Sequence, residues 1–376
     1  MALVASLLAA CETAAPAAPG PAPSSPSSTQ PSPPAEVAVA FIQDLSLEGS
    51  LDRTLPVLQA VELAFATASL SQNHPLNVDV VSFDTQGDPT AATEIAREIS
   101  GDPAFVAAIA APDLPGQAEL VSELSAADVP LLSLSGRGSV GAAPPGTWLR
   151  IVAPLDAQAR RVAQTAATLR PARTGVCLIA APPDGTTFAR TVRRSLPHEV
   201  VEVVGAAGVE EAGCGIVVWT GDAVAGAELV AALAEEAPPT PVLVGGPVLR
   251  DPRFLAIAEA SAEGMISICP CTDVSTSLDL DAQRFIQDYQ SEYGSPPGPY
   301  AVEAWDATHL LIRGLREAGP GRSGLVDWIG LQTEIDGLDH TYVVEDGELA
   351  DPESSVGRFR VRGGRWIEFD ASTSPE

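Results

Sequence analysis

The sequence has few aromatic residues and far fewer basic residues than acidic ones. Phe, Trp and Tyr make up 5% of the 376 residues, and 21 Lys and Arg stand against 49 Asp and Glu, which gives a net charge of −28. A surface this acidic repels nucleic acid and anionic lipid headgroups. Nucleic acid is therefore not an expected partner, and contact with a membrane would need a covalent anchor.

Long apolar runs and the motifs of common enzymes are also missing. No stretch of the sequence beyond its N-terminal segment approaches the ~20 apolar residues of a membrane span. Gly-x-Ser-x-Gly, His-Glu-x-x-His and Walker motifs do not occur, and the four His are scattered along the sequence. Cys269 and Cys271 have no nearby His to complete a zinc site. We expect no enzyme, no metal and no cofactor, and keep a cell-surface hydrolase only as an alternative.

The first 35 residues combine a short apolar run with a tract rich in Ala, Pro and Ser. Leu8-Ala9-Ala10-Cys11 closes the apolar run, and this pattern resembles the lipobox of bacterial lipoproteins. In that class the signal is removed before the Cys, whose thiol then carries a diacylglycerol. The resemblance implies a signal peptide over residues 1–11, lipidation of Cys11, and a solvated tether over 12–35. The alternative is a disordered N-terminus in which Cys11 has no role.

The rest of the chain is long enough for two domains and alternates between strand and helix patterns. Its first half carries apolar strand patterns over 37–41, 78–83, 105–110 and 129–135. Helical stripes separate them, such as Ala92, Ile95 and Ile99 behind the cap Asp88-Pro89. Strands joined through helices imply a parallel sheet covered on both faces.

The alternation begins again at Asp156, after a segment (147–154) that we interpret as a crossing between two halves. Further strands are predicted over 175–179, 200–204, 216–219 and 241–244. Two amphipathic helices follow, over 281–293 and 300–318, and then a β-hairpin over 356–370 with Gly363-Gly364 at its turn.

Four segments in this order resemble type I periplasmic binding proteins, the solute-binding subunits of branched-chain amino acid ABC importers. They are Asp84–Pro89, the strand at 105–110, Ala262–Met265 and Gly298–Tyr300. The resemblance covers residues 35–370 and implies an α/β fold of two Rossmann-like lobes, with parallel sheets and a hinge of three crossings. It places residues 36–154 and 271–355 in lobe 1, and residues 155–270 and 356–370 in lobe 2.

Ligands of open parallel sheets bind outside the carboxyl ends of the strands. With the resemblance, this predicts ligand contacts at Asp113, Ser135, Gly136, Arg137, Asp184 and Asp222. Relatives usually carry Ser or Thr in the loop that matches Asp113–Gly116 and Thr at the position of Arg137, so amino-acid specificity is not carried across. The guanidinium of Arg137 suits a carboxylate or phosphate. The alternative for Arg137 is a structural ion pair with a neighbouring acid.

The four cysteines of the body are expected to behave in two ways. In the strand order that the resemblance implies, the strands carrying Cys177 and Cys214 are neighbours, so we predict a disulfide between them. Cys269 and Cys271 are too close in sequence for an easy bridge, and we expect two buried thiols.

The resemblance as a whole implies an extracytoplasmic solute-binding protein on the outer face of the bacterial cell membrane, anchored there only through Cys11. Its partners would be a small polar, amino-acid-like ligand and ABC permease subunits. The alternative is a sensor or interaction lipoprotein that kept the fold and lost transport.

Overall fold

The computed structural model describes most of the chain. The described residues are 36–46, 49–70, 76–138, 140–141, 143–169, 175–180, 185–196, 200–236 and 239–369. Cys11, the predicted signal peptide and tether, and Asp184 lie outside the described residues.

The first sheet has five strands in the order β2-β1-β3-β4-β5, all parallel. Their bounds are Asn77–Asp84 (β2), Glu36–Gln43 (β1), Phe105–Ala110 (β3), Leu131–Ser133 (β4) and Trp148–Arg150 (β5). The four predicted strands are β1 to β4. The fifth, β5, lies inside the segment that the sequence marked only as a crossing.

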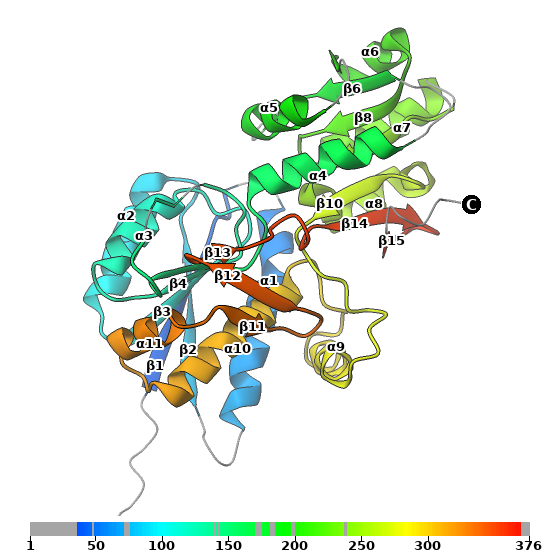
Figure 1. Ribbon diagram of the computed structural model, residues 1–376. Coiled ribbons are helices and arrows are strands. Elements are labelled where there is room, and N and C mark those ends of the chain that lie inside the picture. The colour runs from blue at the N-terminus through cyan, green and yellow to red at the C-terminus, as the bar shows by residue number, and fades with distance from the viewer. Residues whose placement is uncertain are drawn as a thin grey trace, which may run out of the picture. The chain divides into compact units, whose positions relative to one another are not determined.

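The alternating side chains of β1 explain how both faces of this sheet are buried. Val39 and Phe41 pack in the core shared with α1 (Ser50–Ser69) and α10 (Ala301–Glu317). Ala40 and Ile42 point to the opposite face and pack with α2 (Pro89–Gly101) and α3 (Gln117–Ser125). Figure 1 shows these helices on either side of the strands. The apolar run therefore builds two cores at once, as expected of a buried parallel strand.

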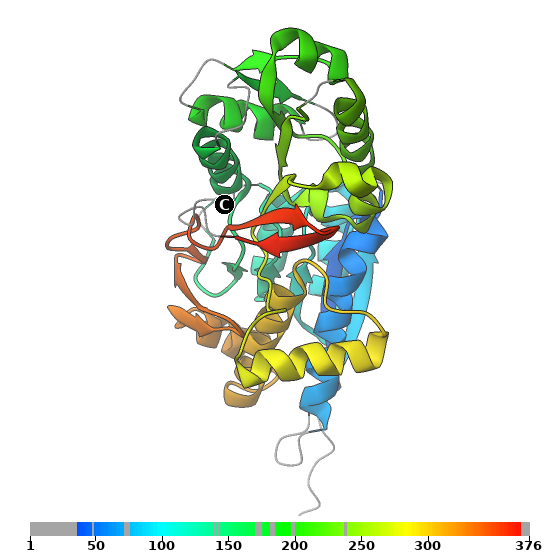
Figure 2. The same ribbon diagram turned by 90° about the vertical axis from the view of Figure 1, so that its right-hand side faces the viewer.

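The second sheet has seven strands in the order β15-β14-β10-β9-β8-β6-β7. Their bounds are Gly175–Ile179 (β6), Val201–Glu202 (β7), Cys214–Trp219 (β8), Val242–Gly245 (β9), Ile266–Cys269 (β10), Gly357–Arg362 (β14) and Arg365–Glu368 (β15). β14 and β15 form the predicted hairpin, and β14 runs antiparallel to β10 (Figure 2). The turn needs two glycines, because Gly363 and Gly364 have φ of 58° and 73°.

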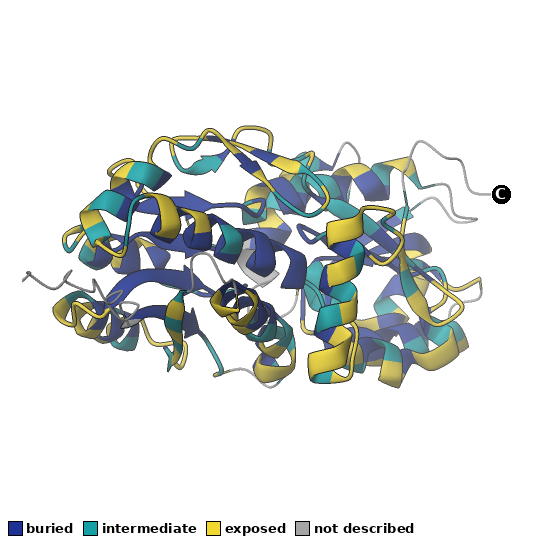
Figure 3. Cartoon of the chain, turned by 90° about the horizontal axis from the view of Figure 1, so that it is seen from below, coloured by how far each residue is buried: buried dark blue, intermediate teal, exposed yellow. Residues whose placement is uncertain are grey.

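Helices cover both faces of the second sheet as well. α4 (Leu155–Thr168) and α5 (Gly185–Ser195) cover one face, and α6 (Gly205–Ala212), α7 (Ala223–Glu236) and α8 (Pro252–Ala258) cover the other. Figure 3 shows the result: buried residues fill the strands and the inner helix faces, and exposed residues lie on the outer surfaces. The α/β fold with two parallel-stranded lobes is confirmed, while the residue bounds of the lobes stay a prediction.

A small third sheet completes the described part and was not predicted. It consists of β11 (Glu334–Asp336), β12 (Thr341–Glu345) and β13 (Glu348–Leu349), in antiparallel pairs. The remaining elements are α9 (Leu280–Tyr293), α11 (Arg322–Ile329) and the 3₁₀ turns η1 (Pro247–Arg250) and η2 (Glu259–Ala262). Short strands of two to five residues carry too little periodicity to stand out in a sequence.

The structure contains two disulfides. One joins Cys177 in β6 to Cys214 in β8, with 5.8 Å between the Cα atoms. The other joins Cys269 to Cys271, so the expectation of two buried thiols there was wrong. The chain bends at Pro270 directly after β10, which brings these two Cα atoms to 5.1 Å, within the ~4.4–6.8 Å that a disulfide spans.

We expect the Cys177–Cys214 bond to contribute to stability, because it closes a loop with a sequence separation of 37 residues. The chain-entropy relation gives about 4 kcal/mol for such a loop, as an upper figure, because residual structure in the unfolded chain reduces the gain. Chemical denaturation of the Cys177→Ala/Cys214→Ala variant should show a loss toward this size. Peptide mapping of the unreduced protein that finds Cys177 alkylated would contradict the prediction.

Candidate functional site

The loops after β3 and β4 bring two predicted site residues together. Asp113 follows β3 in a left-handed conformation with φ of 62°, and Arg137 follows β4. Arg137 Nε lies 3.5 Å from Asp113 Oδ1, and the two side chains are 23% and 39% exposed. At this separation and exposure the pair contributes little stability. The pair therefore places a cationic and an anionic side chain next to each other at the carboxyl edge of the sheet.

Ser135 and Gly136 make close contacts within the protein, and their contact with a ligand stays a prediction. The buried Ser135 Oγ donates to Leu114 O at 3.2 Å and accepts from Arg137 N at 3.2 Å. A Cβ on Gly136 would lie 2.4 Å from Gln158 Nε2 and 2.8 Å from Ala153 O. This close approach to the start of α4 explains why a glycine is needed at position 136.

Arg150, at the end of β5, holds the same loop from behind and was not predicted. Its Nη1 donates to three carbonyls, those of Ser135 (3.4 Å), Arg137 (3.4 Å) and Gly138 (3.1 Å). Nε and Nη2 donate to the two carboxylate oxygens of Glu348 in β13, at 2.8 and 2.6 Å. The fork geometry of a guanidinium makes this bidentate contact possible. Arg150 is therefore a positioning residue for the loop that carries Arg137.

Tyr300 and Glu303 lie at the start of α10, in lobe 1, and the charges of Asp113 and Arg137 act on Tyr300. Tyr300 caps the helix in a left-handed conformation with φ of 65° and is 8% exposed. Burial raises the pKa of its phenol, the charges of Asp113 and Glu303 raise it further, and those of Arg137 and Arg250 oppose them. The charges of four groups thus act on one phenol, and two of these groups are predicted site residues.

Glu303 is a buried carboxylate with one satisfied oxygen. Its Oε1 accepts from the backbone N–H of Thr272 at 2.7 Å, and its Oε2 has no hydrogen-bond partner among the described residues. Burial raises the pKa of this carboxyl to about 7, against the hydrogen bonds of Thr272 and the charge of Arg250, which lower it. A buried polar oxygen without a hydrogen-bond partner is costly, so this atom can accept a hydrogen bond from a ligand when the carboxyl is ionised or donate one when it is protonated.

Arg250, in lobe 2, adds a positive charge that interacts with Tyr300 and Glu303. It ends η1, shortly after β9, and its guanidinium carbon lies 3.9 Å from the centre of the Phe359 ring. Nε and Nη1 are buried without hydrogen-bond partners among the described residues. Burial lowers the pKa of Arg250 to about 10, opposed by the charges of Asp273, Glu368, Tyr300 and Glu303. The charged cluster (Asp113, Arg137, Tyr300, Glu303 and Arg250) thus draws on both lobes.

Asp222, predicted as a ligand contact in lobe 2, makes a local contact. Its exposed carboxylate accepts from the backbone N–H of Ala225 at 2.8 Å, at the start of α7. This is the geometry of a helix cap, which favours a structural role for the side chain. Its contact with a ligand stays a prediction.

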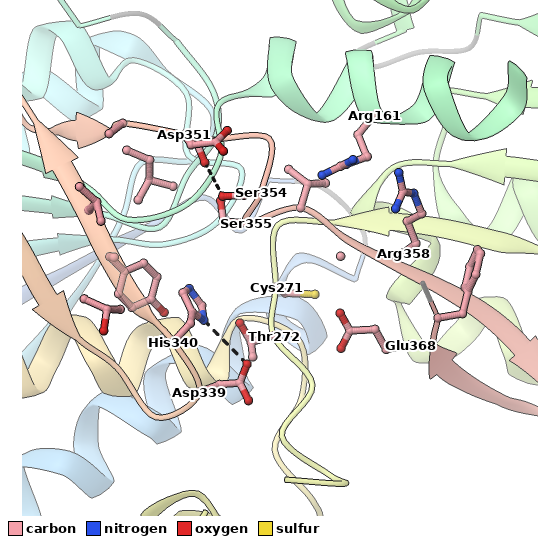
Figure 4. A pocket seen from close by; sticks show the side chains of 18 residues that line it. Arg161, Cys271, Thr272, Asp339, His340, Asp351, Ser354, Ser355, Arg358 and Glu368 are labelled. Atoms are coloured by element: carbon pink, nitrogen blue, oxygen red, sulfur yellow. Dashed lines mark hydrogen bonds and ion pairs between the residues drawn. The ribbon is translucent and has the colours of Figure 1, made fainter. Parts of the chain in front are cut away.

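A cavity of about 850 Å³ lies elsewhere, between α4, the 271–272 segment, β12 and the hairpin (Figure 4). Its charged lining residues are Arg161, Arg358, Asp339, Asp351 and Glu368, with His340 beside them. None of the five predicted ligand contacts that the structure describes lines this cavity. None of its lining residues belongs to the segments directly after β3, β4 and β9, where ligands of parallel sheets bind, so the charged cluster is the better candidate site.

Two α/β lobes with a charged cluster at the carboxyl ends of their strands define a two-lobed binding protein. The family described as periplasmic binding proteins matches residues 36–327, more than half of the chain. The chain therefore belongs to the periplasmic binding protein family, and the resemblance seen in the sequence is confirmed. No curated protein matches the chain.

Solved structures show the same fold at low sequence identity. The leucine binding protein LivK of Thermotoga maritima has a TM-score of 0.72 and 16% identity over 89% of this chain and 98% of its own. An ABC transporter substrate-binding protein of Desulfitobacterium hafniense, in complex with Leu, has a TM-score of 0.70 and 16% identity over 89% and 100%. LivJ of Streptococcus pneumoniae, in complex with isoleucine, has a TM-score of 0.69 and 16% identity over 89% and 100%.

None of the helices that the structure describes is both long enough and apolar enough to cross a membrane. Among the described residues, no three His, Cys, Asp or Glu side chains gather as they would to hold a metal ion.

Proposed function

We propose that this protein is the solute-binding subunit of an ABC importer and captures a small polar, amino-acid-like ligand between its lobes. The observation that carries the proposal is the charged cluster, which combines Asp113, Arg137 and Glu303 of lobe 1 with Arg250 of lobe 2. Charges of both signs, with partnerless polar atoms on Glu303 and Arg250, suit a ligand with both an anionic and a cationic or hydroxyl group. Membership of the family and the fold shared with LivK and LivJ support this function.

A thermal-shift screen of the purified protein against amino acids, amides, polyamines, sugars and short peptides tests the proposal. A ligand at 100 times its Kd that binds only the folded state should add about 2.7 kcal/mol to the free energy of unfolding. No shift with any of these classes would favour the alternative, a sensor or interaction lipoprotein that lost transport. Neighbouring genes for a permease and an ATPase would favour the importer.

Arg137→Ala should abolish the ligand-induced stabilisation and leave the melting temperature without ligand nearly unchanged. The reason is that Arg137 would bind the anionic group of the ligand, whereas its part-exposed pair with Asp113 stabilises the fold by less than about 1 kcal/mol. Arg97→Ala is the matched control, since it removes a surface ion pair with Glu123 on the outer helices. A loss of several kcal/mol without ligand would instead make Arg137 a structural ion-pair member, and an unchanged ligand affinity would remove it from the site.

We also propose that the mature protein begins at a lipidated Cys11 and sits on the outer face of the cell membrane. The support is the apolar run that ends at this Cys and the Pro-rich tract behind it. Cys11→Ala should move the protein from the membrane fraction to the soluble fraction, as measured by immunoblotting after fractionation. Full retention of this variant in the membrane fraction would contradict the anchor.

A further inference from the structure

An ion pair links the two lobes between α1 and α8, through residues that are not members of the charged cluster. Arg53 lies in the first turn of α1, in lobe 1, and its Nη1 is 3.3 Å from Oδ2 of Asp251 in lobe 2. Asp251 caps α8, and its side chain is fully buried, with 0% exposure. The same carboxylate binds Arg253, whose Nε lies 3.0 Å from Oδ1 and whose Nη2 lies 2.7 Å from Oδ2.

The three charges form one network around a single carboxylate. Asp251 Oδ1 accepts from the backbone N–H and Nε of Arg253, and Oδ2 accepts from Arg253 and from Arg53. Burial alone would raise the pKa of Asp251, yet the hydrogen bonds and charges of Arg253 and Arg53 hold it below its usual value. A buried carboxylate with this many donors is ionised and keeps its geometry. Only Arg53, of these two partners, comes from the other lobe.

The guanidinium of Arg253 packs against the backbone of Gly49 in lobe 1. A Cβ on Gly49 would lie 1.6 Å from Arg253 Nη2 and 2.2 Å from its guanidinium carbon. Gly49 also has φ of 76°, at the N-terminal end of α1. The guanidinium of lobe 2 therefore rests directly on the backbone of lobe 1, at a position where only glycine leaves room for it.

We propose that Asp251, with Arg53 and Arg253, forms a latch that holds the two lobes together when no ligand is bound. The contact needs no ligand, since all its donors and acceptors belong to the chain. Opening the lobes would separate Arg53 from Asp251 and lift Arg253 from Gly49, and the carboxylate would lose its donor from lobe 1. The latch uses none of the residues of the charged cluster, so it stands whether or not the proposed ligand is correct.

The latch can be tested by small-angle X-ray scattering of the purified protein without ligand. Arg53→Gln removes the charge that crosses between the lobes, so the radius of gyration should rise. Arg97→Gln makes the same change at an ion pair within lobe 1 and should leave the radius unchanged. Circular dichroism at the temperature of the scattering experiment checks that each variant is folded.

Gly49→Ala supplies a second, steric test. The added methyl group would collide with Arg253, so the lobes should open and the radius of gyration should again rise. Gly294→Ala makes the same change at another left-handed position, with φ of 73° and open space around its Cβ, and should leave the radius unchanged. An unchanged radius in both Arg53→Gln and Gly49→Ala would overturn the latch.

Discussion

Arg150→Ala should lower the free energy of unfolding by about 3 kcal/mol and should also weaken ligand binding. The substitution leaves the carbonyls of Ser135, Arg137 and Gly138 without their shared donor, and it leaves Glu348 without its bidentate partner. The Arg150 side chain is 3% exposed, so water cannot replace it without rearrangement. Glu348 is 36% exposed and can turn to solvent, which limits the loss. Equilibrium unfolding in urea measures the change.

Arg150→Lys and Glu348→Gln separate the two parts of this contact. Lysine keeps the charge but cannot donate to both carboxylate oxygens and to the loop carbonyls at once, so its loss should be close to that of alanine. Glu348→Gln keeps an acceptor and leaves the carbonyl contacts in place, so its loss should be smaller. A loss under about 0.5 kcal/mol for Arg150→Ala, the range of ordinary surface substitutions, would show that the loop holds its shape without this side chain.

The fold was predictable from local patterns because those patterns coincide with the burial that the structure shows. In β1 the run Val37–Ile42 is apolar on both faces, as a central parallel strand requires. Asp88 accepts from Thr90 N at 2.8 Å directly before Pro89, so the helix start read from the sequence is a real cap. Each of these signals is contained within a few neighbouring residues.

The candidate site was predictable only in part, because its contacts are long-range. Asp113 and Arg137 follow strands, so their place at the sheet edge could be predicted, whereas their 3.5 Å contact could not. Glu303 could have been recognised as a candidate from the sequence, because it is a carboxylate on the buried stripe of α10, between Ala301 and Trp305.

Arg150 shows a different limit of reading from the sequence. It ends a three-residue strand, Trp148–Arg150, and its carboxylate partner Glu348 lies 198 residues further along the chain. Nothing local indicates that a charged residue in such a position is buried. Its role depends on the third sheet, whose short strands the sequence did not reveal.

Stability should fall as the pH rises from about 5 to above 8, because two buried carboxyls of α10 hold protons in the folded state. Burial raises the pKa of Asp306 to about 8, with the charges of Glu303 and Asp339 adding to the effect and hydrogen bonds from Tyr342 and Leu338 opposing it. Burial likewise raises the pKa of Glu303 to about 7. In the unfolded chain both groups return to their ordinary values of 3.8 and 4.5.

The direction follows from the protons released on unfolding. Between pH 5 and 7 the folded protein keeps protons on both carboxyls and the unfolded chain does not, so each unfolding event releases protons and is favoured by higher pH. Each proton released changes the free energy of unfolding by about 1.4 kcal/mol per pH unit. The stabilisation is complete below the unfolded pKa values and is lost as the pH rises through 7 and 8, a total of several kcal/mol.

Urea unfolding at pH 5.5, 7.0 and 8.5 measures this dependence, and Asp306→Asn assigns it. Asparagine can still accept from Leu338 N and can pair with the Tyr342 hydroxyl, which lies 2.8 Å from Asp306 Oδ2, but it has no proton to lose. The variant should therefore show a shallower decline and exceed the parent protein in stability at pH 8.5. Asp281→Asn, at a side chain that is 77% exposed, should leave the slope unchanged. Stability that stays level or rises from pH 7.0 to 8.5 in the parent protein would contradict the raised pKa values of these two carboxyls.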